Sequence, residues 1–221
     1  MKRFLRNNGL AVVTLGVFLV IWLGGQTWAG HRSYNEDQRS HGGATVSFPR
    51  YLTTAHFGEA TFENWESEFL QMGAYVLLTV RLTQRGSAES KPPGGHEAVD
   101  DDPEAHRDDP HAPWPVRRGG LALKLYANSL SIAFFALFAL SFALHAATGA
   151  REFNNEQVAH GEPTVSGFGF LARSEFWFQS LQNWQSEFLA VGSLVVLTIF
   201  LRQQGSPESK PVHAPHRETD G

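Results

Sequence analysis

Apolar residues along this chain are gathered into four blocks, and polar stretches separate the blocks. The first, residues 10–29, runs for about 20 residues without a charge, which at 1.5 Å per residue matches a hydrocarbon core about 30 Å thick. A similar long apolar block, residues 125–148, lies in mid-chain. Both predict spanning helices. A secretory signal peptide is the alternative for the first block, but the mid-chain copy argues against it.

The other two blocks, residues 69–80 and 188–201, are too short to span a membrane when they are counted only between charges. Helices that begin at Trp65 and Trp184 would reach about 18 residues, with Asn64 before the first as its N-cap and Asn183 before the second. The two Trp rings would then anchor the helices at the lipid headgroups. A re-entrant or interfacial helix is the competing interpretation of each block.

A shift of 119 positions places residues 30–92 on residues 149–211 without a gap. The best-matched segments pair NWESEFL with NWQSEFL, and RGSAESKP with QGSPESKP. Such self-similarity predicts a tandem duplication in which each copy forms one supersecondary unit. We expect an all-α membrane protein with four transmembrane helices, arranged as two parallel tandem two-helix repeats. The predicted boundaries are 1–91 and 121–210 for the modules, 92–120 for a disordered polar linker and 211–221 for a disordered tail.

Two helices per module return the chain to its starting side, so both modules insert in the same sense. Basic residues gather on the side that holds the termini and the linker, which predicts that this side is cytoplasmic in a bacterial inner membrane. They are Lys2, Arg3, Arg6, Arg81, Arg85, Lys91, Arg117, Arg118, Lys124, Arg202, Lys210 and Arg217, against Arg32, Arg39, Arg50, Arg151 and Arg173 on the other side.

Composition narrows the function further. The chain has no cysteine, which excludes disulfides, thiolate metal sites and a cysteine nucleophile. Its net charge of -4 offers no basic stripe for phosphates, so no nucleic-acid partner is expected and the lipid bilayer is the expected partner. The duplicated NWxSEFL and GSxESKP motifs, together with the RNNGL start, resemble a family of uncharacterised bacterial membrane proteins that carry a domain of unknown function. This resemblance implies no activity, cofactor or catalytic residue.

Glu68 and Glu187 are the sharpest candidate site, because they occupy matched positions and a carboxylate at membrane depth is costly. Facing each other across a pseudo-twofold axis, they would share a proton or bind a cation. The competing interpretation is that each carboxylate lies in the first turn of its helix and is stabilised by the helix dipole. A polar stripe accompanies both, for helix adhesion or for a hydrophilic path: Asn64, Ser67, Gln71, Gln179, Asn183 and Ser186.

His41 and His160 are also matched, and they raise the question of zinc or copper. No HxxxH or HExxH spacing occurs, so surface loop histidines are favoured over a metal site, and no metal or cofactor is expected. The absence of a nucleophile elbow, a P-loop or a dinucleotide fingerprint disfavours an enzyme without deciding the matter.

The function that the sequence favours is therefore a non-enzymatic inner-membrane component with an envelope or stress-related structural role. One alternative is a small channel or proton-coupled transporter that uses Glu68 and Glu187, for which four helices enclose too little volume unless the chain forms a homo-oligomer. The other is an outward-facing sensor or binding module formed by the two external loops.

Overall fold

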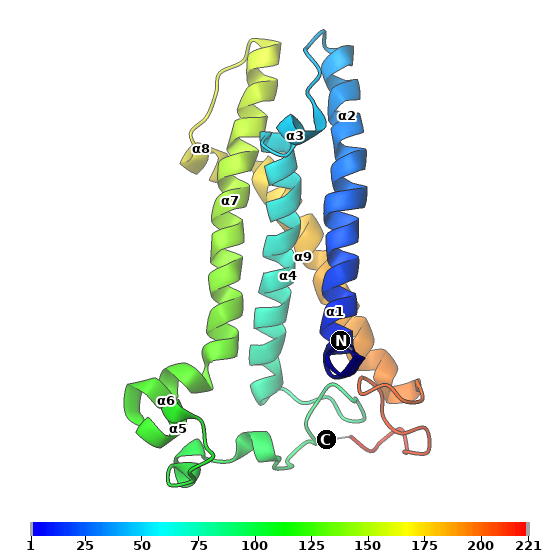
Figure 1. Ribbon diagram of the computed structural model, residues 1–221, viewed down its shortest axis with the longest axis vertical. Coiled ribbons are helices and arrows are strands. Elements are labelled where there is room, and N and C mark those ends of the chain that lie inside the picture. Colours follow the sequence, from blue (N-terminus) through cyan, green and yellow to red (C-terminus); the bar gives the residue numbers. More distant parts are fainter. Residues whose placement is uncertain (1, 220–221) are drawn as a thin grey trace. The chain divides into compact units, whose positions relative to one another are not determined.

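The computed structural model describes residues 2–219, which form helices and loops without a strand among them. The chain begins with α1 (Lys2–Leu19), the π-helical η1 (Val20–Gln26) and α2 (Thr27–Ser40). α1 is kinked at Asn8, and from there the three elements follow one another as one continuous rod (Figure 1). The later elements are α3 (Phe48–Tyr51), α4 (Ala55–Arg81), η2 (Ala98–Asp100), η3 (Pro103–His106), α5 (Trp114–Arg118), α6 (Gly120–Ala127), α7 (Ser129–His160), α8 (Gly167–Leu171) and α9 (Ser174–Phe200).

Three of the described helices are long and apolar enough to cross a membrane: Phe4–Ser40, Ser129–His160 and Ser174–Phe200. These helices suggest a membrane protein. The expectation of four such helices was wrong for α4, which has 27 residues but is not sufficiently apolar. The cause is local, because its first half carries four glutamates and charges at the centre of a spanning helix are the most costly residues to insert. They are Glu59, Glu63, Glu66 and Glu68.

The helices α4 and α9 begin well before the positions that the apolar blocks suggested. The structure starts them at Ala55 and Ser174, about ten residues ahead of Trp65 and Trp184. These added turns, AHFGEATFEN and SEFWFQSLQN, mix polar with apolar residues, so no continuous apolar block marked them. Asn64 and Asn183 are consequently interior helix residues, and the prediction that they are N-caps was wrong.

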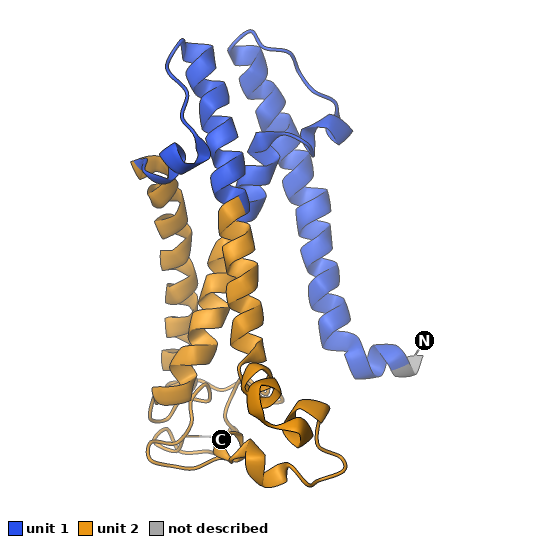
Figure 2. Ribbon diagram, turned by 90° about the vertical axis from the view of Figure 1, so that its left-hand side faces the viewer, with its two compact units in different colours: residues 1–62, 144–173 blue, residues 63–143, 174–221 orange. Residues whose placement is uncertain are grey.

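Two compact units divide the chain, and each takes residues from both halves of the sequence (Figure 2). Unit 1 comprises residues 1–62 and 144–173, and unit 2 comprises residues 63–143 and 174–221. The helices α4 and α7 each contribute to both units.

Within unit 1, two asparagines fix the chain that follows their helices. The side chain of Asn35 in α2 accepts a hydrogen bond from Val46 N at 2.7 Å and donates one to Val46 O at 2.9 Å. Asn154 in α7 makes the same two bonds with Val165, at 2.7 and 2.8 Å. Each pair mimics a backbone ladder and satisfies both polar groups of one loop residue. The returning loops are thereby held against α2 and α7.

Close aromatic contacts follow in the same unit. A Cβ on Gly30 would lie within 3.4 Å of the Tyr51 ring and clash with its hydroxyl, and a Cβ on Gly149 would lie 2.6 Å from a ring carbon of Phe170. Tyr51 and Phe170 are fully buried. Glycine is required at both positions because a side chain there would displace the ring that closes the loop onto its helix.

Unit 2 is held by aromatic packing between α7 and α9. The ring of Phe176, which is fully buried, meets Phe142 edge-on at 5.1 Å, and Phe142 also lies 6.2 Å from Trp177. On α4, Gly73 is in close contact with Phe134 and Phe135 of α7. The helices of this unit therefore pack through large rings and one small residue, as spanning helices commonly do.

Candidate functional site

A polar pocket of about 380 Å³ lies in unit 1, between the last turns of α2 and α7. Both helices run on past the apolar region, so the pocket is built from helix ends rather than from the loops alone. Most of the side chains that line it are polar or charged: Tyr34, Asp37, Gln38, His41, Gly43, Glu152, Asn155, Glu156, Ala159 and His160.

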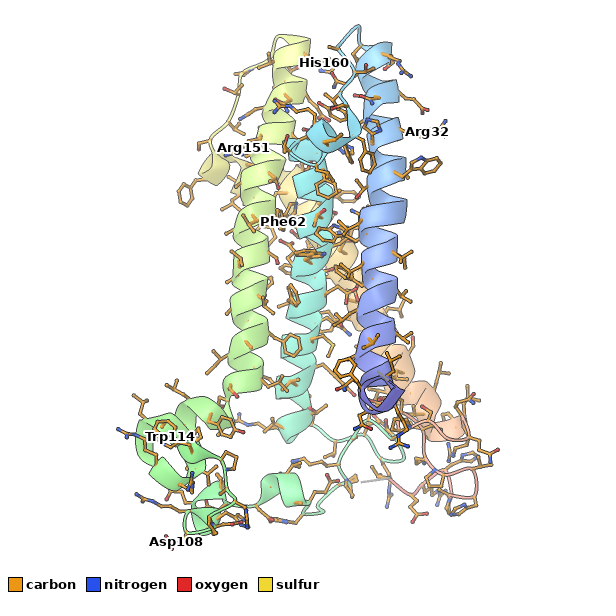
Figure 3. The ribbon with its side chains drawn as sticks, in the orientation of Figure 1. Arg32, Phe62, Asp108, Trp114, Arg151 and His160 are labelled. Atoms are coloured by element: carbon orange, nitrogen blue, oxygen red, sulfur yellow. The ribbon has the colours of Figure 1, made fainter. Side chains whose placement is uncertain are left out.

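The two matched histidines come together in this pocket. The rings of His41 and His160 have their centroids 6.1 Å apart, with 73° between their planes. Figure 3 shows His160 at the end of α7 in unit 1. Residues 119 positions apart are thus neighbours in space, which the sequence raised only as a weak alternative.

Each imidazole is oriented by the helix that carries it. His160 Nδ1 lies 2.8 Å from Glu156 O, and His41 Nδ1 lies 3.1 Å from Asp37 O and 3.3 Å from Asp37 Oδ1. Because a carbonyl oxygen can only accept, Nδ1 carries the proton in both neutral rings. The lone pair of each neutral ring is therefore on Nε2, which is the arrangement found in metal-binding histidines that donate their other nitrogen to a carbonyl or carboxylate.

The charge of the pocket is acidic. Three carboxylates line it, those of Asp37, Glu152 and Glu156, and the lining contains no lysine or arginine. Such a pocket favours a cation, which would offset the mutual repulsion of the carboxylates. Two imidazoles that bind one tetrahedral zinc-sized ion have centroids roughly 5 Å apart, since the metal–nitrogen bond is about 2 Å. The observed 6.1 Å is longer, so the two rings would move about 1 Å closer to bind one ion.

Among the described residues, no three histidine or carboxylate side chains are already placed around one point as metal ligands. The two imidazoles are therefore the nitrogen ligands that the pocket lining offers to an ion. Water, or a rotation of an exposed carboxylate such as Asp37 or Glu156, would complete the coordination.

One wall of the pocket is stiffened by a buried aromatic cluster. Tyr51 and His56 share a hydrogen bond of 3.0 Å between the phenol oxygen and Nδ1, and the Tyr34 ring lies 5.4 Å from His56. Burial raises the pKa of Tyr51 to about 12, and the charge of Glu152 adds to the rise. Burial also lowers the pKa of His56. Both groups consequently stay neutral near pH 7, and they act as packing rather than as charges.

A second polar region lies in unit 2, inside the helix bundle. Glu66 of α4 has no exposed surface, and Ser180 Oγ donates to its Oε1 at 2.6 Å. Asn183 Nδ2 donates to Glu63 Oε1, also at 2.6 Å. The sequence comparison passed over Glu66 because the matched position is Gln185, although the cost of a buried charge makes it a candidate in its own right.

Comparison with known proteins places the chain in a family. A family model described as a domain of unknown function matches residues 1–221. The chain belongs to the DUF6766 family. The DUF6766 match includes the linker, which the motif resemblance had left out. No curated protein and no solved structure matched the chain.

The DUF6766 chain places Glu68 and Glu187 in unit 2, close enough to interact electrostatically. Glu68 is exposed and Glu187 is half-buried. Each lies in the fourth turn of its helix, because α4 begins at Ala55 and α9 at Ser174. Stabilisation by the dipole falls off after the first turn, so the dipole does not account for these carboxylates.

The predicted polar stripe of the DUF6766 chain divides by burial. Ser67 and Gln71 are buried, Gln179 and Asn183 are half-buried, and the other two are exposed: Asn64 and Ser186. The serines close bonds within their own helices, from Ser67 Oγ to Asn64 O at 2.7 Å and from Ser186 Oγ to Asn183 O at 2.8 Å. The stripe thus serves local bonds and the contact of Asn183 with Glu63.

The predicted anchors, Trp65 and Trp184, are both half-buried in unit 2. Trp184 packs edge-on against Phe138 at 6.2 Å and against Trp177 at 6.3 Å. Its ring therefore contributes to the contact between α7 and α9.

Proposed function

We propose that this protein is a multi-pass protein of the bacterial inner membrane that binds one divalent transition-metal ion at the polar end of unit 1. The observation that carries the proposal is the His41–His160 pair, whose rings lie 6.1 Å apart in an acidic pocket. With the termini and the linker in the cytoplasm, this end faces outward. Sensing or buffering of a metal there would be a non-enzymatic envelope or stress-related role.

The choice of metal follows from the donors. Imidazole nitrogen suits Zn²⁺, Cu²⁺ and Ni²⁺, whereas Mg²⁺ and Ca²⁺ prefer an all-oxygen shell. Both histidines have a carboxylate four residues earlier, Asp37 before His41 and Glu156 before His160. Residues four apart share one face of a helix, so each helix offers an imidazole with a carboxylate beside it.

Isothermal titration of the purified protein with Zn²⁺ and Ni²⁺ tests the proposal. We expect one ion per chain, and at least tenfold weaker binding for His41→Ala and for His160→Ala, since each change removes a protein ligand. His106→Ala in the exposed part of the linker is the matched control and should bind as the wild type does. Wild-type affinity in the double variant His41→Ala/His160→Ala would overturn the proposal.

A second candidate function rests on a separate observation, the full burial of Glu66 beside Ser180. A buried carboxylate among membrane helices commonly marks a path for protons or cations. A homo-oligomer would be needed to enclose a pore around it. Glu66→Gln keeps the shape of the side chain, so proton or cation flux into vesicles should fall while the protein still inserts; unchanged flux would remove this candidate.

A further inference from the structure

A groove of about 500 Å³ runs between α4 and α9 in unit 2, apart from the histidine pocket. Its volume is in the range that holds a drug-sized ligand. Most of its exposed lining is apolar, and the larger apolar side chains are those of Leu78, Leu82, Phe188, Val191, Val195 and Val196.

The middle of the α9 wall is open. Gly192 has no heavy atom within 4 Å of the position that a Cβ would take, and Phe188 and Val196, one turn to either side, are exposed. A stretch of helix this bare leaves room for a hydrocarbon chain alongside α9.

The polar end of the groove holds a carboxylate without a counter-charge. Tyr75 donates its hydroxyl proton to Glu89 Oε2 at 3.0 Å, while Glu89 Oε1 is buried and has no hydrogen-bond donor among the described residues. Burial raises the pKa of Glu89, and the nearby charge of Glu208 raises it further. Lys91 does not compensate this charge, because its Nζ is bound to Asp100 and to Val80 O.

The loop that carries Glu89 is fixed rather than loose. Ser87 is fully buried, its Oγ lies 3.0 Å from Thr198 Oγ1 on α9, and it accepts a bond from Glu89 N, also at 3.0 Å. The turn before it needs the positive φ of Gly86, where a side chain would meet the backbone of His216. The carboxylate therefore has a set position at the groove.

We propose that this groove binds an amphiphile with an ammonium head and a single alkyl chain, the chain lying between α4 and α9 and the head against Glu89. Charge complementarity selects the occupant, since Glu89 is the one charged residue among those described as lining the groove. An ammonium group supplies the donor that Oε1 lacks. The site includes neither His41 nor His160, so a negative result for metal binding would leave this proposal unaffected.

Three probes with the same dodecyl chain separate the contributions of head and chain: dodecyltrimethylammonium, dodecylamine and dodecyl sulfate. Binding to the full-length protein in nanodiscs of neutral lipid is measured by competition against a fluorescent alkylammonium dye. We expect dodecylamine to bind most tightly, because it can donate to Oε1, and dodecyl sulfate to bind at least about tenfold more weakly.

Two variants test the two ends of the site. Glu89→Gln should weaken dodecylamine by about tenfold and should leave dodecanol unchanged, because only the charge is removed. A Cβ at Gly192 meets no heavy atom within 4 Å, so Gly192→Leu extends a side chain into the open wall and should weaken all of the alkyl probes. Glu104→Gln, an exposed carboxylate elsewhere in unit 2, is the control for net charge.

Equal binding of dodecylamine and dodecyl sulfate would overturn the proposal, since the groove would then be apolar without selecting a charge. Wild-type affinity in Gly192→Leu would overturn it as well, since the chain would lie elsewhere. If Glu89→Gln fails to fold, Gly192→Leu and the comparison of head groups in the wild type still decide the question.

Discussion

His56 is a titratable side chain that unit 1 holds in its neutral form. Burial lowers its pKa below the usual value of 6.5, and the nearby carboxylates of Asp37 and Glu156 oppose this shift only in part. The unfolded chain binds the proton at a higher pH than the folded chain does, so folding stability rises with pH across this window. The stability contributed by neutral His56 is present above about pH 6.5 and is lost as the pH falls through the lowered pKa.

We therefore expect the melting temperature of the wild type to fall between pH 7 and pH 5 more steeply than that of His56→Gln, which cannot titrate there. The measurement is differential scanning fluorimetry of both proteins in the same neutral detergent. Parallel curves would show that His56 is not the group that links stability to pH.

Adding a side chain at Gly149 should lower the stability of unit 1. A methyl group there would lie 2.6 Å from the buried ring of Phe170, so Gly149→Ala should destabilise unit 1 by about 1 to 3 kcal/mol through overpacking. Gly16→Ala is the matched control, because Gly16 has open space around it and alanine favours a helix. The melting temperature of Gly149→Ala should fall below that of the wild type, and that of Gly16→Ala should rise or stay unchanged.

Some of these side chains could be predicted from sequence and others could not. The 119-residue shift pairs His41 with His160, and Asp37 with Glu156 four residues earlier, so the composition of the pocket was available. The sequence could not predict that His41 and His160 lie close together in space, because this depends on where α2 and α7 end. Glu66 was missed for the opposite reason, since a comparison between copies detects only what both copies share.

Helix boundaries in this chain follow polar residues that the apolar pattern does not register. The first turns of α4 include Glu59 and Glu63, and these polar residues suggested a loop. The structure continues the helix through this segment, because tertiary contacts override a weak local preference. The block in residues 10–29 is helical throughout, as predicted, since a long charge-free run has few alternatives. The block in residues 125–148 is helical except at Asn128, where α6 ends and α7 begins.

The loops after α2 and α7 offer a test at the level of the element. Asn35 and Asn154 each make two bonds with one loop valine, so Asn35→Ala and Asn154→Ala should each cost about 2 kcal/mol, chiefly by leaving the valine N–H without its acceptor. Val46 O keeps the His31 ring, whose Nε2 lies 2.8 Å away. Asn155→Ala, one position further along α7 on an exposed side chain, is the control. Hydrogen exchange at Val46 and Val165 should rise in the matching variant alone; exchange that rises at both sites would contradict independent loops.

The number of crossings is a property of the whole molecule, and α4 decides it. If α4 crosses with its glutamates covered by other helices, reporters at Gly42 and Gly95 lie on opposite sides of the membrane. If only the three apolar helices cross, the two reporters lie on the same side.

We expect opposite sides, with Gly95 cytoplasmic, because basic residues flank the linker and such residues favour the cytoplasmic side. α4 would then cross although it is less apolar than the other three helices. Paired alkaline phosphatase and green fluorescent protein fusions at both positions give the answer. A fusion after Glu218 serves as the reference, since α9 is apolar enough to cross and should bring the tail to the side of Gly95.

The π-helical segment η1 gives the first rod a spare residue. A π-turn takes in about one residue more than an α-turn, and Thr27 Oγ1 meets the carbonyl of Trp22 at 2.7 Å across it. Removing Gly25 should convert the segment to regular α-helix and leave the angular setting of α2 unchanged. Removing Ser33 should instead turn the rest of α2 by about 100°, which carries His41 away from His160. A one-residue deletion in η1 should therefore leave the contact between His41 and His160 intact, whereas a one-residue deletion in α2 should break it.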